Sequence, residues 1–252
     1  MLVTLATRTF TPEPTAAELR LGALARALAA GGNRVRVLTS RLAPTVARDA
    51  ASSADDPHGP TPLEREGGTQ GQGAPAETGN GEGGHGLVEV RRAPVLRDKT
   101  VAVRGYVSYL SFDLPLIARL LTGARLDVVV SEPPPTTGAA VRLACALRRL
   151  PYVYYCADIV SDAAALAGVP RPIVRAVAAL ESFALRGARS VIAVSDGVAR
   201  RARDLGAKRV VVVPNGVRVP EAVAGGVPEG FPSCTGPVFV YAGTVAHWLA
   251  PE

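Results

Sequence analysis

The sequence has few of the residues on which metal and redox chemistry depend. Its 252 residues include three cysteines, three histidines and one methionine. The cysteines, at Cys145, Cys156 and Cys234, are odd in number and lack a metal-binding spacing, which indicates buried free thiols. His58 and His85 lie in a tract that offers no ordered partner, so neither is expected to bind a metal. The sequence therefore predicts no metal site.

Long hydrophobic runs are also missing. Arginine or aspartate interrupts every apolar stretch before it reaches the about 20 residues that a bilayer requires, so no spanning helix is expected. The first eight residues contain neither a basic leader nor a long apolar segment, which argues against a signal peptide. A cytoplasmic protein is predicted. The 48% hydrophobic content is enough for one large core or two modest ones.

Charge is distributed unevenly along the chain. Residues 43–86 carry seven acids and two arginines, a net charge of −5, so that the remainder of this +6 chain carries +11. A strongly basic α/β domain commonly meets phosphates, nucleic acid or an anionic membrane surface. Because the sequence has no aromatic-rich basic strand and no basic recognition helix, nucleic acid is disfavoured. We therefore expect that the basic domain can contact the inner face of the cell membrane peripherally.

The acidic tract 43–86 has little to bury. It holds ten of the 26 glycines, no aromatic residue, and only Val46 and Leu63 as large aliphatic residues. We predict a disordered insertion. Gly79–Gly84 fits the dinucleotide-binding pattern GxGxxG, but no strand precedes it and no helix follows it, so we reject a dinucleotide site.

Residues 127–158 are expected to form the centre of the fold, because they show the pattern strand, loop, helix, strand. Residues 127–131 are a β-branched run, typical of a strand buried on both faces. Three prolines then break the strand, and Thr136 or Thr137 is expected to cap a helix over 139–149. A strand over 152–157 follows. The ligand crevice of such a βαβ unit lies beyond the carboxyl ends of its strands.

Glu132 and Asp158 follow the two strands of this unit, so both are predicted to face the crevice. Asp158 is the better candidate, since packing explains a carboxylate at the end of a central strand poorly; the alternatives are a helix cap or a loop salt bridge. A second βαβ unit at the amino terminus brings the loop 8–15, with Glu13 and Thr15, to the same crevice. The elements of this second unit are a strand over 2–6, a helix over 16–30 and a strand over 34–39.

The remaining periodicity predicts alternating strands and helices as far as residue 213. Tyrosine, phenylalanine and leucine in the helix over 101–121 indicate either a core face or a face that leans on a membrane or lipid acceptor; Pro115 can kink it. Ser195 and Asp196 are expected to cap a helix rather than to touch a ligand. The expected elements are strands over 87–91, 190–194 and 209–213, and helices over 101–121, 172–186 and 198–205.

Four segments carry a family resemblance. They are Phe10–Thr15; Tyr106–Phe112; Val191–Ser195 together with Val211–Val217; and Phe239–Thr244. In order and spacing they resemble the amino-terminal domain of a glycosyltransferase family 4 enzyme of the GT-B fold. The similarity is greatest to the branch that builds bacterial surface polysaccharides. The resemblance implies a Rossmann-like doubly wound parallel sheet over residues 1–218, a linker over 219–237, and the start of a second, donor-binding domain over 238–252.

The resemblance also implies an activity, which is retaining transfer of a sugar from a nucleotide-sugar donor to a sugar or polyprenyl-linked sugar acceptor, with no metal or other cofactor. It assigns the catalytic role to Asp158. With the second domain cut off at Glu252, the isolated chain is expected to be inactive. The binding residues that the resemblance implies are Glu13, Thr15, Glu132 and Asp162 for the acceptor, and Gly243 and Thr244 for the donor.

Three positions depart from the pattern of the family. Ala157 stands where many members have a histidine, Tyr155 stands where relatives have an acid, and Thr15 and Ala16 replace a common Gly-Gly pair. These departures keep open an alternative function, a non-catalytic sugar-binding module or a degenerate transferase fragment. A nucleotide-sugar epimerase would need a catalytic histidine, and no ordered candidate precedes His247.

Overall fold

A computed structural model gives the fold of the chain and describes residues 1–13, 15–44, 46–47, 65–66, 88–97, 106–123 and 125–216. The predicted linker, the predicted start of a second domain, Gly243 and Thr244 lie outside the described residues. Most of the predicted insertion 43–86 lies outside them as well. Of the three predicted free thiols, Cys145 and Cys156 are confirmed as buried and unpaired, and Cys234 is not described.

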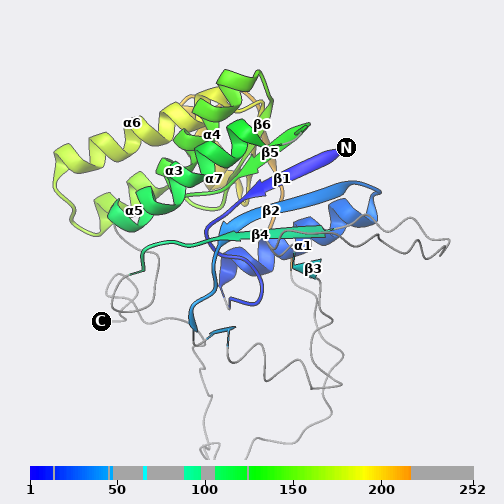
Figure 1. Ribbon diagram of the computed structural model, residues 1–252. Helices are drawn as coiled ribbons and strands as arrows, with labels where there is room; N and C mark the ends of the chain where they lie inside the picture. Colours follow the sequence, from blue (N-terminus) through cyan, green and yellow to red (C-terminus); the bar gives the residue numbers. More distant parts are fainter. Residues whose placement is uncertain are drawn as a thin grey trace, which may run out of the picture.

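The centre of the fold is an eight-stranded sheet in which every neighbouring pair is parallel (Figure 1). The strand order is β3-β4-β2-β1-β5-β6-β7-β8. The strands are β1 Leu2–Ala6, β2 Arg34–Ser40, β3 Arg65–Glu66, β4 Val88–Ala93, β5 Val128–Ser131, β6 Tyr152–Cys156, β7 Ser190–Ala193 and β8 Val210–Val212. Strand β2 and the strands beyond it lie on one side of β1, and β5 to β8 follow one another on its other side. The direction in which strands are added to the sheet therefore reverses between β1 and β5. The doubly wound Rossmann-like fold is therefore confirmed.

Helices cover both faces of the sheet. They are α1 Ala16–Ala30, α3 Tyr106–Thr122, α4 Pro135–Arg148, α5 Val160–Leu166, α6 Arg171–Gly187 and α7 Asp196–Asp204. Leu21 and Ala25 of α1 pack in one core cluster with Leu5 of β1. The opposite face holds the second cluster, where α3, α4 and α6 pack on Val129 and Tyr154. Figure 1 shows α1 on one side of the sheet and α3, α4 and α6 on the other.

The start of α4 differs from the prediction. The helix begins at Pro135 rather than Ala139, and its N-cap is Pro134, which makes no side-chain cap hydrogen bond. Neither Thr136 nor Thr137 caps it, so this prediction is wrong. The physical reason is that proline suits the first helical turn, because its fixed φ is helical and its missing N–H leaves one donor fewer to satisfy. The Thr137 hydroxyl is thereby available for contacts elsewhere.

Three further elements differ from the prediction. The short helix α5 was not expected, since no side-chain cap within its own sequence announces it. Arg65 and Glu66 form β3 and pair with Glu89 and Val90 of β4, so the prediction of disorder across the insertion is wrong at these two residues. A backbone ladder needs no apolar side chain, which is why composition missed it. In the described part of the predicted helix 101–121, α3 continues through Pro115 without a break.

Gly138 allows α4 to approach both the sheet and α6. A Cβ atom at this position would lie 2.6 Å from Cε2 of Tyr154 and 2.9 Å from Cβ of Ala184. Because all three positions are buried, we expect Gly138→Ala to lower the free energy of unfolding by about 2 kcal/mol through overpacking. Urea denaturation measures the change. The matched control is Gly197→Ala, where the nearest atom lies 3.8 Å from the added Cβ; equal stability of the two variants would contradict this account of the packing.

Candidate functional site

Polar side chains gather where the order of the sheet reverses. Thr7 and Arg8 directly follow β1, Glu132 directly follows β5, and Asp158 lies two residues beyond β6. Strands β1, β5 and β6 are neighbours and parallel, so these residues meet at one edge. Open α/β sheets bind their ligands in the crevice at such a switch point. Glu132 and Asp158 therefore lie at the same edge of the sheet, as the order of the strands predicted, and their roles stay a prediction.

Glu132 is a buried carboxyl group at the centre of this edge. Its side chain is only 5% exposed, and its Oε1 atom contacts the hydroxyl of Thr7. Burial raises the pKa of Glu132 to about 7, while the Thr7 hydroxyl and the charges of Arg20 and Arg8 hold it lower than burial alone would. Asp158 adds a small repulsive contribution that raises the pKa. Glu132 is consequently poised to gain or lose a proton near neutral pH.

The Thr7 hydroxyl links the protonation state of Glu132 to the loop that follows β1. Besides contacting Glu132, Oγ1 of Thr7 lies 2.8 Å from the carbonyl oxygen of Thr9 and accepts a hydrogen bond from the Thr9 backbone N–H at 3.3 Å. A hydroxyl has one proton to donate. Protonated Glu132 can donate to Thr7 and leave that proton for Thr9, whereas ionised Glu132 competes with Thr9 for it. The charge on Glu132 thus bears on the position of this loop.

Asp158 lies on the exposed turn between β6 and α5. The surrounding protein raises its pKa by desolvation, and the positive charge of Arg20 opposes this rise. Arg20 comes from the first part of α1, across the crevice, and its Nε atom is buried without a hydrogen-bond partner in the described part of the chain. Arg20 was not predicted as a site residue, because its only signal in the sequence is its place one turn into the helix that starts at the crevice.

Glu181 of α6 fixes the segment that follows Asp158. This fully buried carboxylate accepts hydrogen bonds from the backbone N–H groups of Val160 and Ser161, at 2.9 and 3.2 Å, and from the Ser161 hydroxyl at 2.6 Å. It supplies the cap that α5 lacks in its own sequence, because a carboxylate satisfies the free N–H groups of a helix amino terminus. The segment directly after Asp158 is therefore anchored by a side chain of α6.

Arg8 forms a buried network beside Glu132. Its Nε atom donates to the Thr137 hydroxyl at 3.3 Å, and that hydroxyl donates to Oδ1 of Asp113 at 2.6 Å. The guanidinium group stacks on the Tyr109 ring, with Cζ 3.7 Å from the ring centre. Burial lowers the pKa of Arg8 and raises that of Asp113. Nη2 of Arg8 and Oδ2 of Asp113 are buried without hydrogen-bond partners among the described residues, so the network has unused donor and acceptor capacity.

Glu13 and Thr15, predicted to bind the acceptor, both lie at the start of α1. Glu13 is buried and pairs with Arg97, with Oε1 and Nη2 2.8 Å apart. Thr15 caps α1 by accepting from the Glu18 N–H at 3.1 Å, and its hydroxyl donates to that of Thr9 at 3.3 Å. The contacts of Thr15 show that it has a structural role. The described bonds of Glu13 and Thr15 are all made to other residues of this chain.

The last of the four predicted acceptor residues, Asp162, lies farther along the chain than the others. It lies in the first turn of α5, is partly exposed, and accepts two hydrogen bonds from Arg201 of α7 at 2.8 and 2.9 Å. This ion pair joins α5 to α7 rather than to β1 or β5. Ser195 accepts from the Val198 N–H at 3.3 Å, so the prediction that it caps a helix is confirmed. Among the described residues, no group of three histidine, cysteine, aspartate or glutamate side chains could hold a metal ion.

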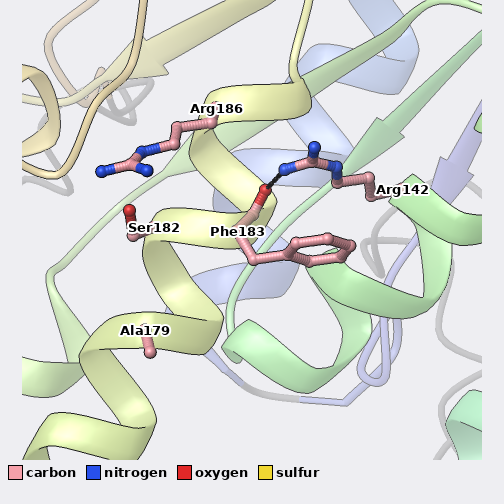
Figure 2. A pocket seen from close by; sticks show the side chains of 5 residues that line it. All are labelled: Arg142, Ala179, Ser182, Phe183 and Arg186. Carbon is pink, nitrogen blue, oxygen red and sulfur yellow. Dashed lines mark hydrogen bonds between the residues drawn. The ribbon is translucent and has the colours of Figure 1, made fainter.

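A hollow of about 430 Å³ lies elsewhere, between α4 and α6 (Figure 2). The Arg142 guanidinium stacks on Phe183, with Cζ 3.9 Å from the ring centre, and donates to the Phe183 carbonyl oxygen. Arg186 lies in the last turn of α6, just before β7 begins, which places the hollow toward the amino ends of the strands. It is a surface feature, separate from the crevice. Its lining residues are Arg142, Ala179, Ser182, Phe183 and Arg186.

Comparison with known proteins agrees with this fold. Sucrose-phosphate synthase from Thermosynechococcus elongatus is 13% identical, with a TM-score of 0.51, and the similarity covers 86% of this chain and 48% of that one. Arabidopsis thaliana UGT89C1 complexed with UDP-L-rhamnose is 12% identical, with a TM-score of 0.50, over 90% and 55%. Anabaena Alr3699/HepE in complex with UDP and glucose is 20% identical, with a TM-score of 0.48, over 86% and 45%. The chain thus spans about half the length of these structures.

Comparison of sequences identifies a family, whereas the comparison of structures shows only the fold. No curated protein sequence matches the chain. The sequence profile of the glycosyl transferase 4-like domain matches residues 15–216, a range that contains α1 with Arg20, Glu132, the Asp158 turn and all strands from β2 to β8. The chain therefore belongs to the family of glycosyl transferase 4-like domains.

Proposed function

We propose that the protein is the acceptor-binding part of a retaining glycosyltransferase. It would transfer a sugar from a nucleotide-sugar donor to a sugar or polyprenyl-linked sugar acceptor in the synthesis of cell-surface glycans, as in the branch that builds bacterial surface polysaccharides. The observation that carries the proposal is the pair of carboxyl groups, Glu132 and Asp158, at adjacent strand ends of a family 4-like fold, with Arg20 facing both. UGT89C1, of similar fold, is described with UDP-L-rhamnose bound, which supports the donor class.

In this proposal Asp158 handles the acceptor. Its carboxylate lies exposed at the crevice, where it can accept a hydrogen bond from a sugar hydroxyl and orient that hydroxyl for transfer. The positive charge of Arg20 favours the ionised form of Asp158, because it opposes the rise of the pKa that desolvation causes. Glu132 lies deeper and would meet a second hydroxyl as donor or acceptor, depending on its protonation. Glu13, Thr15 and Asp162 would bind the acceptor from the two ends of the same crevice.

The donor would bind on the opposite wall. Sugar transfer needs the departing diphosphate to be stabilised as its charge develops, and positive groups and helix amino termini do this best. Gly243 and Thr244, outside the described residues, would approach the diphosphate at the start of the donor-binding domain. No metal or other cofactor forms part of the proposal. The proposed domain limits are 1–218, 219–237 and 238–252, and the proposed location is the cytoplasm, with peripheral contact to the inner face of the membrane.

A second candidate is a sugar-binding module without catalysis. Ala157 favours it, because many family members have a histidine immediately before the acid that corresponds to Asp158. In this case the crevice would bind the acceptor sugar through Glu132, Asp158 and Arg20, and no transfer would follow. The two candidates differ in turnover and not in binding.

Release of nucleoside diphosphate, with a polyprenyl-linked sugar acceptor present, tests the proposal. We expect release by a protein that carries these 252 residues together with a complete donor-binding domain, and none by the 252-residue chain, since one wall cannot neutralise the diphosphate. Acceptor binding to the 252-residue chain is measured in parallel by calorimetry. Binding without release in both proteins would favour the sugar-binding module, and release by the 252-residue chain would contradict the divided site.

A further inference from the structure

Large apolar side chains are exposed along two neighbouring helices. On α3, Leu110, Leu114 and Leu121 are 52%, 61% and 37% exposed, and on α4, Leu143 and Leu147 are 50% and 74% exposed. Positions 110, 114 and 121 share one face of α3, because residues four and seven apart in a helix lie on the same side. Positions 143 and 147 share one face of α4 in the same way. We call these five residues the leucine surface.

The two parts of the leucine surface lie on helices that pack against each other. The hydrogen bond from Thr137 to Asp113 joins their first halves. At the other end, Nη1 of Arg148 donates to the carbonyl oxygens of Leu120 and Gly123, at 2.7 and 3.0 Å. Both helices cover the same face of the sheet (Figure 1). Soluble proteins rarely leave so many large apolar side chains together on a surface without a binding role.

The charge of the same helical layer is strongly one-sided. Within α3, α4 and α6 the two acids are Asp113 and Glu181, and both are buried. These three helices therefore carry a net positive charge and expose no carboxylate of their own. Seven arginines belong to these helices or directly follow α4, namely Arg119, Arg142, Arg148, Arg149, Arg171, Arg175 and Arg186.

We propose that the leucine surface binds an anionic lipid membrane. Leucines of this kind enter the boundary between headgroups and acyl chains, while flanking arginines stay at the negatively charged headgroups. A second copy of the chain fits less well, since two such surfaces would bring two sets of arginines together. None of the described helices is long and apolar enough to cross a bilayer, and the contact proposed is peripheral. The inference deepens the proposed function and rests on it only for the lipid-linked acceptor.

Vesicle flotation with the 252-residue chain tests the surface without donor or acceptor, so that a failure of the proposed activity would leave the result unaffected. Vesicles of phosphatidylcholine with about one-third phosphatidylglycerol should bind the protein, and vesicles of phosphatidylcholine alone should bind it much more weakly. The double substitution Leu114→Ser with Leu147→Ser should lower the partition coefficient at least about tenfold, given the transfer free energy of two leucine side chains. Raising the salt concentration should weaken binding as well, because it screens the arginines.

The matched control is Leu19→Ser. Leu19 is 61% exposed, the same as Leu114, but it lies on α1, on the opposite face of the sheet; its substitution should leave binding unchanged. Equal loss in the control and the double variant would overturn the proposal, as would equal binding to both kinds of vesicle. Sedimentation velocity provides the second measurement. A concentration-dependent dimer that the double substitution dissolves, without vesicle binding by the original chain, would assign the surface to self-association instead.

Discussion

Replacing Asp158 by asparagine is expected to lower kcat for sugar transfer about a hundredfold, the low end of the range for a positioned acid or base. The substitution keeps the size of the side chain and removes its charge and its ability to act as a base. If the carboxylate acts mainly as the transition state forms, KM for the acceptor should change little. The measurement is steady-state release of nucleoside diphosphate by a protein with a complete donor-binding domain.

The pH profile separates a role in the reaction from a role in the fold. Desolvation raises the pKa of Asp158 above its ordinary value, so the rate should fall as the pH drops through this raised pKa. The Asn variant should lose that acid limb. It should also show a lower pKa for Glu132, since Asp158 is a repulsive charge beside it. The control is Asp204→Asn, an exposed acid of α7; undiminished turnover in the Asp158 variant would remove this residue from the mechanism.

Glu132→Gln is expected to raise the free energy of unfolding at pH 8 by about 3 kcal/mol relative to the unsubstituted protein. Burial raises the pKa of Glu132 from 4.5 to about 7 in the folded protein. Below pH 4.5 the carboxyl group is protonated in both states, and it costs no stability. Between pH 4.5 and 7 the unfolded chain loses this proton while the folded protein keeps it, so stability falls as the pH rises; above pH 7 the loss is complete.

Glutamine avoids this loss because it is neutral at every pH and its amide can donate to the Thr7 hydroxyl, as a protonated Glu132 would. Urea denaturation of both proteins from pH 4.5 to pH 8 measures the effect. The two curves should meet near pH 4.5 and diverge toward pH 7, and the Asp204→Asn control should run parallel to the original protein. Parallel curves for Glu132→Gln would show that burial does not hold the pKa of this group near neutrality.

A stabilising substitution at Glu132 would also bear on the site itself. Packing alone gives no reason to place a carboxyl group in a buried position where its ionised form lowers stability, and functional sites are where such groups are found. The Gln variant should therefore be tested for acceptor binding together with its stability. Gained stability with weakened binding would be the pattern expected of a binding residue.

Periodicity and composition predicted the sheet and the crevice. The β-branched run that became β5 and the alternation in β2 identify strands without any knowledge of their neighbours, because burial on a parallel sheet demands such residues locally. Since parallel strands place their carboxyl ends at one edge, the positions of Glu132 and Asp158 followed from order along the chain. The prolines before α4 marked a break correctly, but whether they also begin the helix depends on φ values that spacing does not reveal.

Only the tertiary structure determined which side chains meet across the elements. Arg20 reaches the crevice because α1 packs back onto β1, and Glu181 caps α5 because α6 returns along α5; neither contact has a signal in local sequence. The pKa of Glu132 depends on how completely its neighbours exclude water, which no window of sequence measures. The leucines of the predicted helix over 101–121 were compatible with a core face or with an exposed one until the packing of α3 showed which side faces outward. Sequence thus determined the order of the elements, and three-dimensional packing decided contact, burial and charge, because those depend on residues far apart in the chain.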